Sequence, residues 1–261
     1  MGLLLAVDVG NTDIAFGVFR EADLIQSWRL QTLRGRTSDE LWLLVDGLFS
    51  HSRIERPSVD GIIVGSVVPS QTGTIRSMAE RYFGITPFIV EPSSNAGMPI
   101  LYENPSEIGA DRIVNAIAAF EQFGRQAPRP VIVCDFGTAT TLDAVTAAGE
   151  YLGGAICPGV TISADALFQR AARLPRVEVR KPSRVVGQNT VGAIESGLFW
   201  GYVGMVDGLL RRIEGELDGT AVCVATGGLA SVIAPEIPMI DHVDVDLTLH
   251  GLGIVWRRNR K

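Results

Sequence analysis

The sequence predicts an α/β protein made of two similar lobes, each with the element order β-β-β-α-β-α. The first observation is a strand, an Asp-x-Gly turn and a second strand at residues 3–19, which recurs at residues 130–146. The second is that each hairpin is followed by a third strand-like segment and then by alternating helix and strand patterns. Because each half repeats the same unit, we expect a duplicated fold.

In the first half, we expect strands near residues 3–9, 13–19, 24–31, 61–66 and 87–90. Thr37 or Ser38 is expected to cap a helix, because a side-chain oxygen there accepts a free backbone N–H. The apolar positions with helical spacing in that helix are Leu41, Leu44, Val45 and Leu48. A second helix is expected between Pro69, which suits a first helical position, and Gly84, which suits a helix end.

In the second half, we expect strands near residues 130–136, 140–146, 153–156 and 221–225. A further helix is expected to begin near Asn189, with a wide apolar face that includes Ile194, Leu198, Phe199, Tyr202 and Val203. The joint at residues 124–130 is short and has no low-complexity segment. We therefore place the two lobes at residues 1–124 and 125–261.

Composition and charge exclude several classes of protein. The chain has 261 residues, of which 46% are hydrophobic, and its net charge is -6. An acidic chain is not expected to bind nucleic acid or an anionic membrane, and we interpret the basic tail at 256–261 as a solvated helix end. No segment approaches the roughly 20 apolar residues of a membrane span. A basic, apolar leader is not recognisable either, so we expect a soluble, cytoplasmic protein without nucleic-acid or membrane partners.

The cysteines and histidines do not form a metal-binding pattern. Cys134, Cys157 and Cys223 share no CxxC spacing and lie in apolar runs, so we expect buried free thiols in a reducing compartment. The three histidines are scattered along the chain, which argues against a zinc site.

The two Asp-x-Gly turns are the first candidate site. Glycine lets the backbone turn tightly and approach a ligand, and such a turn aims several N–H groups at one point. Asp8 in the first turn and Asp135 in the second are placed to hold a cation that carries the countercharge of the ligand. Two such hairpins facing each other would bind a metal-bound polyphosphate. The alternative is that both are ordinary hairpins with favourable turn residues.

The second candidate site is Gly109-Ala110-Asp111-Arg112, at the start of an expected helix that ends at Gly124. Asp111 offers a carboxylate base, and Arg112 offers a guanidinium that binds an anionic group through two hydrogen bonds. Phosphoryl transfer requires little more than a carboxylate, cation placement and alignment. The alternative is that Asp111 only complements the dipole of its helix.

Duplicated lobes with an Asp-Gly hairpin in each resemble the actin-like, sugar-kinase-like ATPase superfamily, whose ribonuclease-H-like lobes bind ATP in a cleft between them. In that superfamily the adenosine lies against a glycine turn, which here corresponds to Gly227-Gly228, although such a pair is weak by itself. A narrower resemblance is carried, in order, by the motifs at residues 8–12, 109–112, 135–139 and 187–190. They read Asp-Val-Gly-Asn-Thr, Gly-Ala-Asp-Arg, Asp-Phe-Gly-Thr-Ala and Gly-Gln-Asn-Thr. Together they resemble the type III pantothenate kinases of coenzyme A biosynthesis over essentially the whole chain.

This resemblance implies a kinase that transfers the γ-phosphoryl of ATP to the primary hydroxyl of pantothenate and gives 4'-phosphopantothenate. It implies that Asp111 accepts the hydroxyl proton and that Asp135 binds a monovalent cation, K+ or NH4+. ATP would be contacted by Asp8, Val9, Gly10, Asn11, Thr12, Asp13, Ile14, Ala15 and Thr138. Pantothenate would be held by Tyr102, Gly109, Ala110, Asp111, Arg112 and Thr190.

The resemblance also implies a divalent cation and an assembly state. Mg2+ accompanies ATP, and Asp8 is expected to bind it through water. Because the family is dimeric with its substrate site near the interface, we expect a homodimer in which the helix at 189–203 takes part. The alternative for this helix is burial inside the second lobe.

Other interpretations stay open at this stage. Taken alone, Tyr102 is a half-buried surface aromatic and Thr190 is a helix cap. The chain is also compatible with a kinase for another small hydroxylated acid or sugar, which a substrate panel would separate. A non-catalytic regulatory accessory protein on the same fold is a third interpretation, against which the presence of Asp8 and Asp111 argues.

Overall fold

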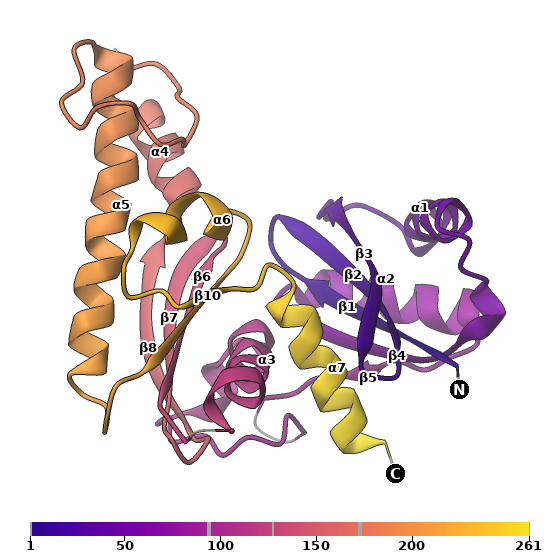
Figure 1. The fold of residues 1–261 in the computed structure, drawn as a ribbon. Coiled ribbons are helices and arrows are strands. Elements are labelled where there is room, and N and C mark those ends of the chain that lie inside the picture. The colour runs from indigo at the N-terminus through magenta and orange to yellow at the C-terminus, as the bar shows by residue number, and fades with distance from the viewer. Residues whose placement is uncertain (1, 93–94, 127, 172–173, 261) are drawn as a thin grey trace. The chain divides into compact units, whose positions relative to one another are not determined.

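The computed structural model describes residues 2–92, 95–126, 128–171 and 174–260. The chain forms two compact units, each with its own sheet (Figure 1). The first comprises Met1–Met98, Glu103–Ala118 and Thr248–Lys261, and the second comprises Pro99–Tyr102 and Ala119–Leu247. The ranges expected from the sequence, 1–124 and 125–261, differ from these units because the chain crosses more than once. In particular, the C-terminal helix belongs to the first unit.

The two sheets have the same topology, which confirms the duplication. The first is ordered β3-β2-β1-β4-β5 and consists of β1 (Leu3–Val9), β2 (Asp13–Arg20), β3 (Asp23–Gln31), β4 (Val59–Ser66) and β5 (Phe88–Ile89). The second, read from its other edge, is ordered β8-β7-β6-β9-β10. It consists of β6 (Val131–Phe136), β7 (Ala139–Val145), β8 (Tyr151–Pro158), β9 (Val222–Thr226) and β10 (His242–Val243). In each sheet the first three strands are antiparallel and the last two run parallel to the central strand. The strands β1 and β6 are therefore equivalent.

The helices are α1 (Ser38–His51), α2 (Pro69–Met78), α3 (Ala110–Ala119), α4 (Val160–Arg170), α5 (Thr190–Glu214), α6 (Ala230–Ile233) and α7 (Leu247–Asn259). Short helical turns add η1 (Arg56–Ser58), η2 (Ala79–Phe83), η3 (Pro105–Glu107), η4 (Phe120–Gly124) and η5 (Ala234–Glu236). No helix in the described part of the chain is both long enough and apolar enough to cross a membrane.

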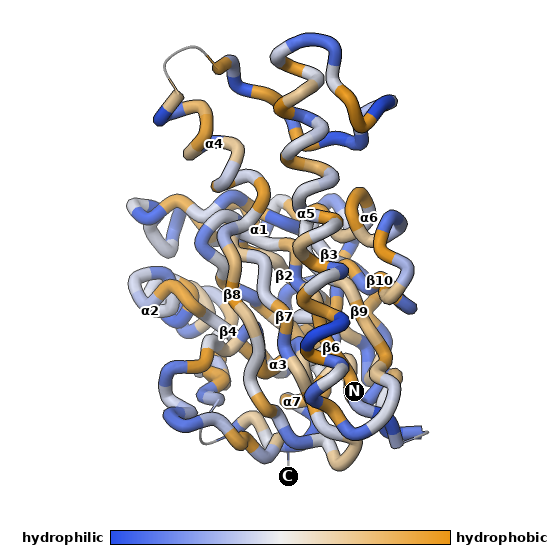
Figure 2. Tube along the Cα trace, turned by 90° about the vertical axis from the view of Figure 1, so that its left-hand side faces the viewer, coloured by the Kyte–Doolittle hydropathy of each residue, from blue (hydrophilic) through white to orange (hydrophobic). Residues whose placement is uncertain are grey.

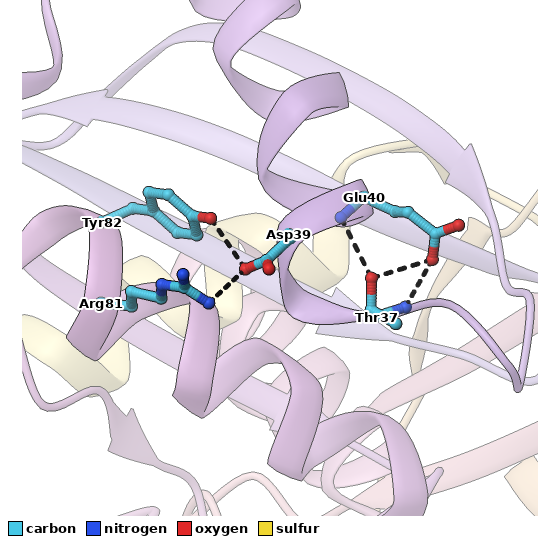
Figure 3. Close-up of polar contacts among 5 residues, drawn as sticks. All are labelled: Thr37, Asp39, Glu40, Arg81 and Tyr82. Carbon is cyan, nitrogen blue, oxygen red and sulfur yellow. Dashed lines mark hydrogen bonds and ion pairs between the residues drawn. The ribbon is translucent and has the colours of Figure 1, made fainter.

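Helix α1 begins at a reciprocal cap. The Thr37 hydroxyl accepts the Glu40 backbone N–H at 3.2 Å, and the Glu40 carboxylate accepts the Thr37 backbone N–H at 2.8 Å (Figure 3). In the first turn of the helix, Asp39 accepts hydrogen bonds from Arg81 and from the Tyr82 hydroxyl, both at 2.7 Å (Figure 3). The bond to Asp39 raises the pKa of the Tyr82 phenol. These contacts tie α1 to η2, which ends as expected at Gly84 with a φ of 68°.

The buried face of α1 differs from the expected one. It consists of Leu41, Trp42, Val45 and Phe49, whereas Leu44 is exposed. The reason is aromatic packing, because Trp42 stacks on Tyr82 with ring centroids 4.9 Å apart, and Phe49 meets Trp28 and Phe83. The helix is therefore turned so that its aromatic residues enter the core.

The two faces of strand β1 have different neighbours. Leu3, Leu5, Val7 and Val9 pack in one core with α1 and α2. The opposite face carries Leu4, Ala6 and Asp8, and glycines beside it let α7 approach the sheet. A Cβ at Gly65 would lie 3.1 Å from Leu252, and one at Gly251 would lie 2.0 Å from the Val114 carbonyl oxygen of α3. In Figure 1, α7 (yellow) lies on the opposite side of this sheet from α1 and α2.

The C-terminal tail is exposed to solvent at residues 257–260, as expected, whereas Trp256 at its start packs on the sheet and residue 261 lies outside the described residues. The Trp256 ring occupies the space over Gly61, where a Cβ would lie 2.2 Å from it. Arg258 donates to the Gly97 carbonyl at 3.1 Å, and Arg260 pairs with Asp60 at 3.1 Å. The absence of a side chain at Gly61 leaves the space that the Trp256 ring fills, and this contact positions the end of α7 on the sheet.

In the second unit, α5 covers the sheet face that carries Ile132, Cys134 and Phe136. Phe199 and Tyr202 of α5 are buried in this core, so for them the alternative of burial inside the second lobe is confirmed. Beyond the sheet, α5 continues next to α4 (Figure 1). The cysteines are free, as expected, but only Cys134 and Cys223 are buried, while Cys157 is partly exposed.

Candidate active site

The first hairpin presents Asp8 near the end of β1. Asp8 pairs with Ala15 of β2 and with Gly65 of β4, and it is partly exposed between buried neighbours. The Gly10 N–H closes the turn on the Asp13 carbonyl at 3.0 Å, which leaves residues 11–13 exposed. Thr32 braces this turn, because its backbone N–H bonds the Thr12 carbonyl and its hydroxyl bonds the Gly10 carbonyl, both at 2.8 Å. The turn is thus held on both sides and open at its tip.

The second hairpin repeats this geometry at Asp135. Asp135 pairs with Thr141 of β7 and with Thr226 of β9, and the Gly137 N–H bonds the Ala139 carbonyl at 3.0 Å. Gly137 and Thr138 are exposed, as residues 11–13 are in the first hairpin. The Thr138 carbonyl accepts the Gly159 N–H at 3.1 Å. This bond holds the second turn in the way that the bonds of Thr32 hold the first.

A glycine turn lies directly against Asp135. Gly227 has a φ of 91°, and a Cβ there would lie 2.4 Å from Asp135 Oδ1 and 2.7 Å from the Phe136 backbone. Only glycine combines this backbone conformation with this approach. The sequence indicated a ligand-binding turn at Gly227-Gly228 but not its contact with Asp135. Gly159 was also missed, although a glycine after Pro158 at a strand-to-helix turn was a visible signal.

The segment at Gly109 begins α3, as expected, and lies near the carboxyl ends of the central strands β1 and β4. Asp111 Oδ1 accepts the Arg112 backbone N–H at 2.8 Å. A Cβ at Gly109 would lie 2.5 Å from that same oxygen and 3.2 Å from the Val67 side chain. Because the Val67 N–H bonds the Val9 carbonyl at 3.1 Å, this turn meets the chain just beyond the ends of β1 and β4. The first unit therefore brings Asp8 and Asp111 to the same end of its central strands.

The two residues that flank Asp111 in the chain are less accessible than it is. Ala110 and Arg112 are 3% and 8% exposed, whereas Gly109 and Asp111 are partly exposed. A buried guanidinium needs polar partners, so Arg112 is held in place before any ligand arrives. This is the arrangement that a fixed binding residue requires.

The two remaining substrate candidates lie in the second unit. Thr190 is the first residue of α5, but Asn189 is the cap, with its Oδ1 accepting the Gly192 N–H at 2.8 Å. The interpretation of Thr190 as a helix cap was therefore wrong. Thr190 lines an open groove of about 640 Å³ together with residues of α4 and α5 that include Leu167, Ala193 and Leu198. Tyr102 is half-buried and lies against Gly153 of β8.

Both hairpin carboxylates fit a cation that takes its other ligands from elsewhere. Among the residues that the structure describes, no three His, Cys, Asp or Glu side chains gather as a closed metal site. Asp8 is partly exposed beside an open turn, which suits a hydrated divalent cation bound to phosphates. Asp135 lies beside the backbone of Gly227 and Phe136, and its carboxylate is an oxygen ligand of the kind that a larger cation accepts.

Comparison of the sequence with protein-family models matches residues 4–212 to the type III pantothenate kinase family. A type III pantothenate kinase of Myxococcus xanthus is 51% identical over 257 residues, which cover 98% of this chain and 99% of the relative. A type III pantothenate kinase of Koribacter versatilis is 50% identical over 268 residues, covering 99% of this chain and 96% of the relative.

Solved structures share the fold at low sequence identity. A component of the (R)-2-hydroxyglutaryl-CoA dehydratase of Acidaminococcus fermentans has a TM-score of 0.56 at 12% identity, covering 97% of this chain and 95% of its own. A ROK family glucokinase of Streptomyces griseus has a TM-score of 0.54 at 13% identity, covering 99% of this chain and 100% of its own. At these identities the likeness concerns the fold alone, and it agrees with the expected architecture of two similar lobes.

Proposed function

The chain belongs to the type III pantothenate kinase family, and we propose which of its residues carry out each part of the reaction. As a member of that family it is an ATP-dependent kinase that phosphorylates pantothenate, in the first step of coenzyme A biosynthesis. The γ-phosphoryl of ATP passes to the primary hydroxyl of pantothenate, which gives 4'-phosphopantothenate and ADP. The observation that carries the assignment is identity of about half of all positions over nearly the whole chain.

Asp111 is the residue that accepts the hydroxyl proton. Its carboxylate is partly exposed at the start of α3, near the strand ends where Asp8 also lies. As the hydroxyl oxygen bonds to phosphorus and the bond to ADP breaks, the proton passes to a carboxylate oxygen of Asp111. Asp111 Oδ1 already accepts the Arg112 N–H, which fixes the orientation of the side chain.

The ATP phosphates contact the first hairpin and Thr138. The contacting residues are Asp8, Val9, Gly10, Asn11, Thr12, Asp13, Ile14 and Ala15, with Thr138 from the second hairpin. Exposed turn residues with backbone N–H groups support this assignment, because such turns bind anions. Mg2+, when bound with ATP, offsets phosphate charge, and Asp8 would hold it through water.

Asp135 holds a monovalent cation, K+ or NH4+. The contact between its carboxylate and the Gly227 turn supports this proposal, because it places a single negative charge beside the backbone of a second segment. A singly charged, weakly hydrated ion suits a site with one carboxylate. Its charge would partly balance the triphosphate.

Pantothenate is held by Gly109, Ala110, Asp111 and Arg112 together with Tyr102 and Thr190. The substrate has a carboxylate, an amide and hydroxyls, so a guanidinium, a phenol and a hydroxyl are suitable partners. Thr190 lies in an open groove and does not cap its helix, which supports a binding role for its hydroxyl. We further propose a cytoplasmic location, where ATP is available.

A second copy of this chain covers the outer surface of α4 and the start of α5. Exposed apolar side chains gather there, namely Ile162, Leu167, Phe168 and Val191, which are between 38% and 46% exposed. The apolar stretches of α4 (orange) are visible in Figure 2. This surface borders the groove of Thr190, which supports a homodimer whose interface adjoins the pantothenate site.

Light scattering tests the homodimer. A dimer has about twice the mass of the 28.0 kDa chain. Phe168→Glu should give a monomer with weaker pantothenate binding, because it places a charge in an apolar contact. Leu43→Glu is the control, because Leu43 is 71% exposed on α1. A fully active monomeric wild-type protein would refute the interface.

A coupled assay tests the reaction and its cation. ADP formation is measured with ATP and pantothenate, in buffers with and without potassium. Turnover should require pantothenate and rise with potassium. A panel of other small hydroxylated acids and sugars should give little turnover, which separates this activity from that of other kinases with the same fold.

A further inference from the structure

We propose that Asp143, Tyr151 and Gly153 of the second unit are positioning residues for pantothenate, because together they fix the place and orientation of Tyr102. This inference rests on the proposed contact between Tyr102 and pantothenate. None of the three residues is assigned a role in that proposal. Their contacts connect Tyr102 to the interior of the second sheet.

The backbone next to Tyr102 is fastened to a single residue of β8. The Tyr151 N–H bonds the Pro99 carbonyl at 2.9 Å, and the Leu101 N–H bonds the Tyr151 carbonyl at 2.8 Å. Ile100 thereby forms a parallel bridge with Tyr151. Residues 99–102 belong to the second unit, although the chain on both sides of them belongs to the first. The strand β8 therefore fixes the position of the backbone from which the Tyr102 side chain projects.

The ring of Tyr102 rests on Gly153. Gly153 has a φ of 114°, and a Cβ there would lie 2.9 Å from both Cδ2 and Cε2 of the Tyr102 ring. The ring centroids of Tyr102 and Tyr151 are 6.3 Å apart, at an angle of 55°. Any larger residue at 153 would push the Tyr102 ring out of this position, since its backbone conformation and its contact both favour glycine.

Tyr151 is in turn held by a buried carboxylate. Tyr151 is fully buried, and its hydroxyl donates to Asp143 Oδ1 at 2.7 Å. Asp143 is 1% exposed, and its Oδ2 accepts the Thr141 hydroxyl at 3.0 Å. A buried carboxylate is costly unless it accepts hydrogen bonds, so these bonds lock the Tyr151 ring in one orientation.

The chain of contacts also reaches the second hairpin. Thr141, which donates to Asp143, is the β7 partner of Asp135. One face of the second sheet therefore carries, in sequence, the proposed cation residue, the buried carboxylate and the support of Tyr102. A purely structural hydrogen bond between β7 and β8 would not need to end beneath a substrate-binding side chain.

The first test compares Michaelis constants for the two substrates in the full-length enzyme. Tyr151→Phe keeps the ring and removes the hydroxyl, and it should raise the pantothenate KM about fivefold while leaving the ATP KM unchanged. Gly153→Ala should act in the same direction by displacing Tyr102. Gly219→Ala is the matched control, because Gly219 has a φ of 105° but a Cβ there would meet no atom within 4 Å. A rise for Gly219→Ala equal to that for Gly153→Ala would overturn the role of Gly153.

The second test asks whether the effect passes through Tyr102. Tyr102→Ala should raise the pantothenate KM about tenfold or more, and adding Tyr151→Phe to it should have no further effect. Asp143→Asn, which keeps an acceptor for Tyr151, should retain more pantothenate affinity than Asp143→Ala. Additive effects in the double variant would refute the inference, as would equal changes in both Michaelis constants.

The two proposals fail in different ways. If Tyr102→Ala leaves the pantothenate KM unchanged, the proposed substrate contact of Tyr102 is wrong and the inference falls with it. If Tyr102→Ala raises this KM and Tyr151→Phe does not, only the positioning role is refuted. Thermal unfolding of each variant shows whether an effect on KM comes with a loss of folded protein.

Discussion

The hairpins of Asp8 and Asp135 have the same backbone arrangement but different neighbours. Both carboxylates stand at the end of a central strand, with one antiparallel and one parallel partner. Beside Asp135, the parallel strand leads into Gly227, whose backbone lies against the carboxylate. At the equivalent place in the first unit stands Ser66, whose hydroxyl accepts the Val68 N–H at 3.1 Å at the start of α2.

This difference indicates how two copies of one unit acquire separate tasks. In the first unit, the Gly109 turn lies near the strand ends that carry Asp8 and so brings in a second carboxylate, Asp111. In the second unit, a glycine turn lies at the corresponding strand ends and brings backbone groups to Asp135. We therefore expect the first unit to carry the proton transfer and the second to hold a cation. Four measurements test this difference between the two hairpins.

The largest effect is expected for Asp111→Asn. A general base contributes roughly 10² to 10⁴-fold in rate, so turnover should fall by that factor. A carboxylate that only complements a helix dipole contributes about 0.3–1 kcal/mol to stability, so the melting temperature should change little. Single-turnover kinetics, ATP binding and thermal unfolding measure the three quantities.

Asp39→Asn is the matched control for this prediction. Asp39 is also an acid in the first turn of a helix, and its contacts with Arg81 and Tyr82 are structural (Figure 3). It should lower stability slightly and leave turnover intact. If Asp111→Asn behaves in the same way, Asp111 is a helix-end residue and not the base.

Asp8→Asn should give the next largest effect. Removal of a group that stabilises charge at the transferring phosphoryl costs about 10² to 10³-fold in rate. We expect such a loss in kcat/KM for ATP, together with a higher Mg2+ requirement. Titration of Mg2+ at fixed ATP measures it. An identical loss in Asp135→Asn, with no change in cation response, would show that the two hairpins do not differ in function.

Substitution of Asp135 should reduce activity less than substitution of Asp8, and its effect should depend on potassium and not on Mg2+. Asp135→Asn should raise the ATP KM about tenfold, which corresponds to about 1.4 kcal/mol, and should blunt the potassium response. Gly227→Ala should act in the same direction, because its Cβ would lie 2.4 Å from Asp135 Oδ1. Gly228→Ala is the control, since a Cβ there would meet nothing within 4 Å. Equal rates in sodium and potassium for the wild type would refute the cation role.

The smallest effect concerns the thiol next to Asp135. Burial raises the pKa of Cys134 well above its usual range, with nearby Cys223, Asp143 and Asp135 adding to the shift, and burial raises the pKa of Cys223 to about 12. In the unfolded chain a thiol ionises near pH 8.5, so the unfolded state loses protons that the folded state keeps. The stabilising contribution is therefore complete below that pH and decreases above it.

This contribution falls by up to about 1.4 kcal/mol per pH unit for each thiol. The melting temperature should consequently drop between pH 8 and pH 10. Cys134→Val should reduce that drop, because valine has no proton to lose, and it resembles Val7 at the equivalent position of the first unit. A pH dependence that is the same in both proteins would contradict the assigned cause.

Several features followed directly from the sequence. The Asp-x-Gly hairpins, the Thr37 cap and the helix end at Gly84 all form as expected. Each depends on residues within a few positions of one another, through a turn conformation or a capping hydrogen bond. The same holds for α3, whose start at Gly109–Asp111 was expected.

Features that depend on distant residues were not predicted. The sequence left open whether Phe199 and Tyr202 face an interface or the interior of the second lobe, and they are buried. It also did not indicate that Trp256, at the start of the otherwise exposed basic tail, packs over Gly61. In each case the local pattern was correct, and the partner that decides the outcome lies elsewhere in the chain.

The family and the duplicated element order followed from the sequence, and so did the residues that we propose for the chemistry, because motifs and periodicity are local. The residues that support them became visible only in the folded structure. It placed Gly227 against Asp135, the Gly109 turn at the edge that carries Asp8, and Tyr102 over Gly153. Each of these contacts joins segments more than forty residues apart, through a glycine that leaves room for a distant side chain or backbone. Alternating polarity and helical spacing carry no record of such pairings, since they reflect only which side of each element is buried.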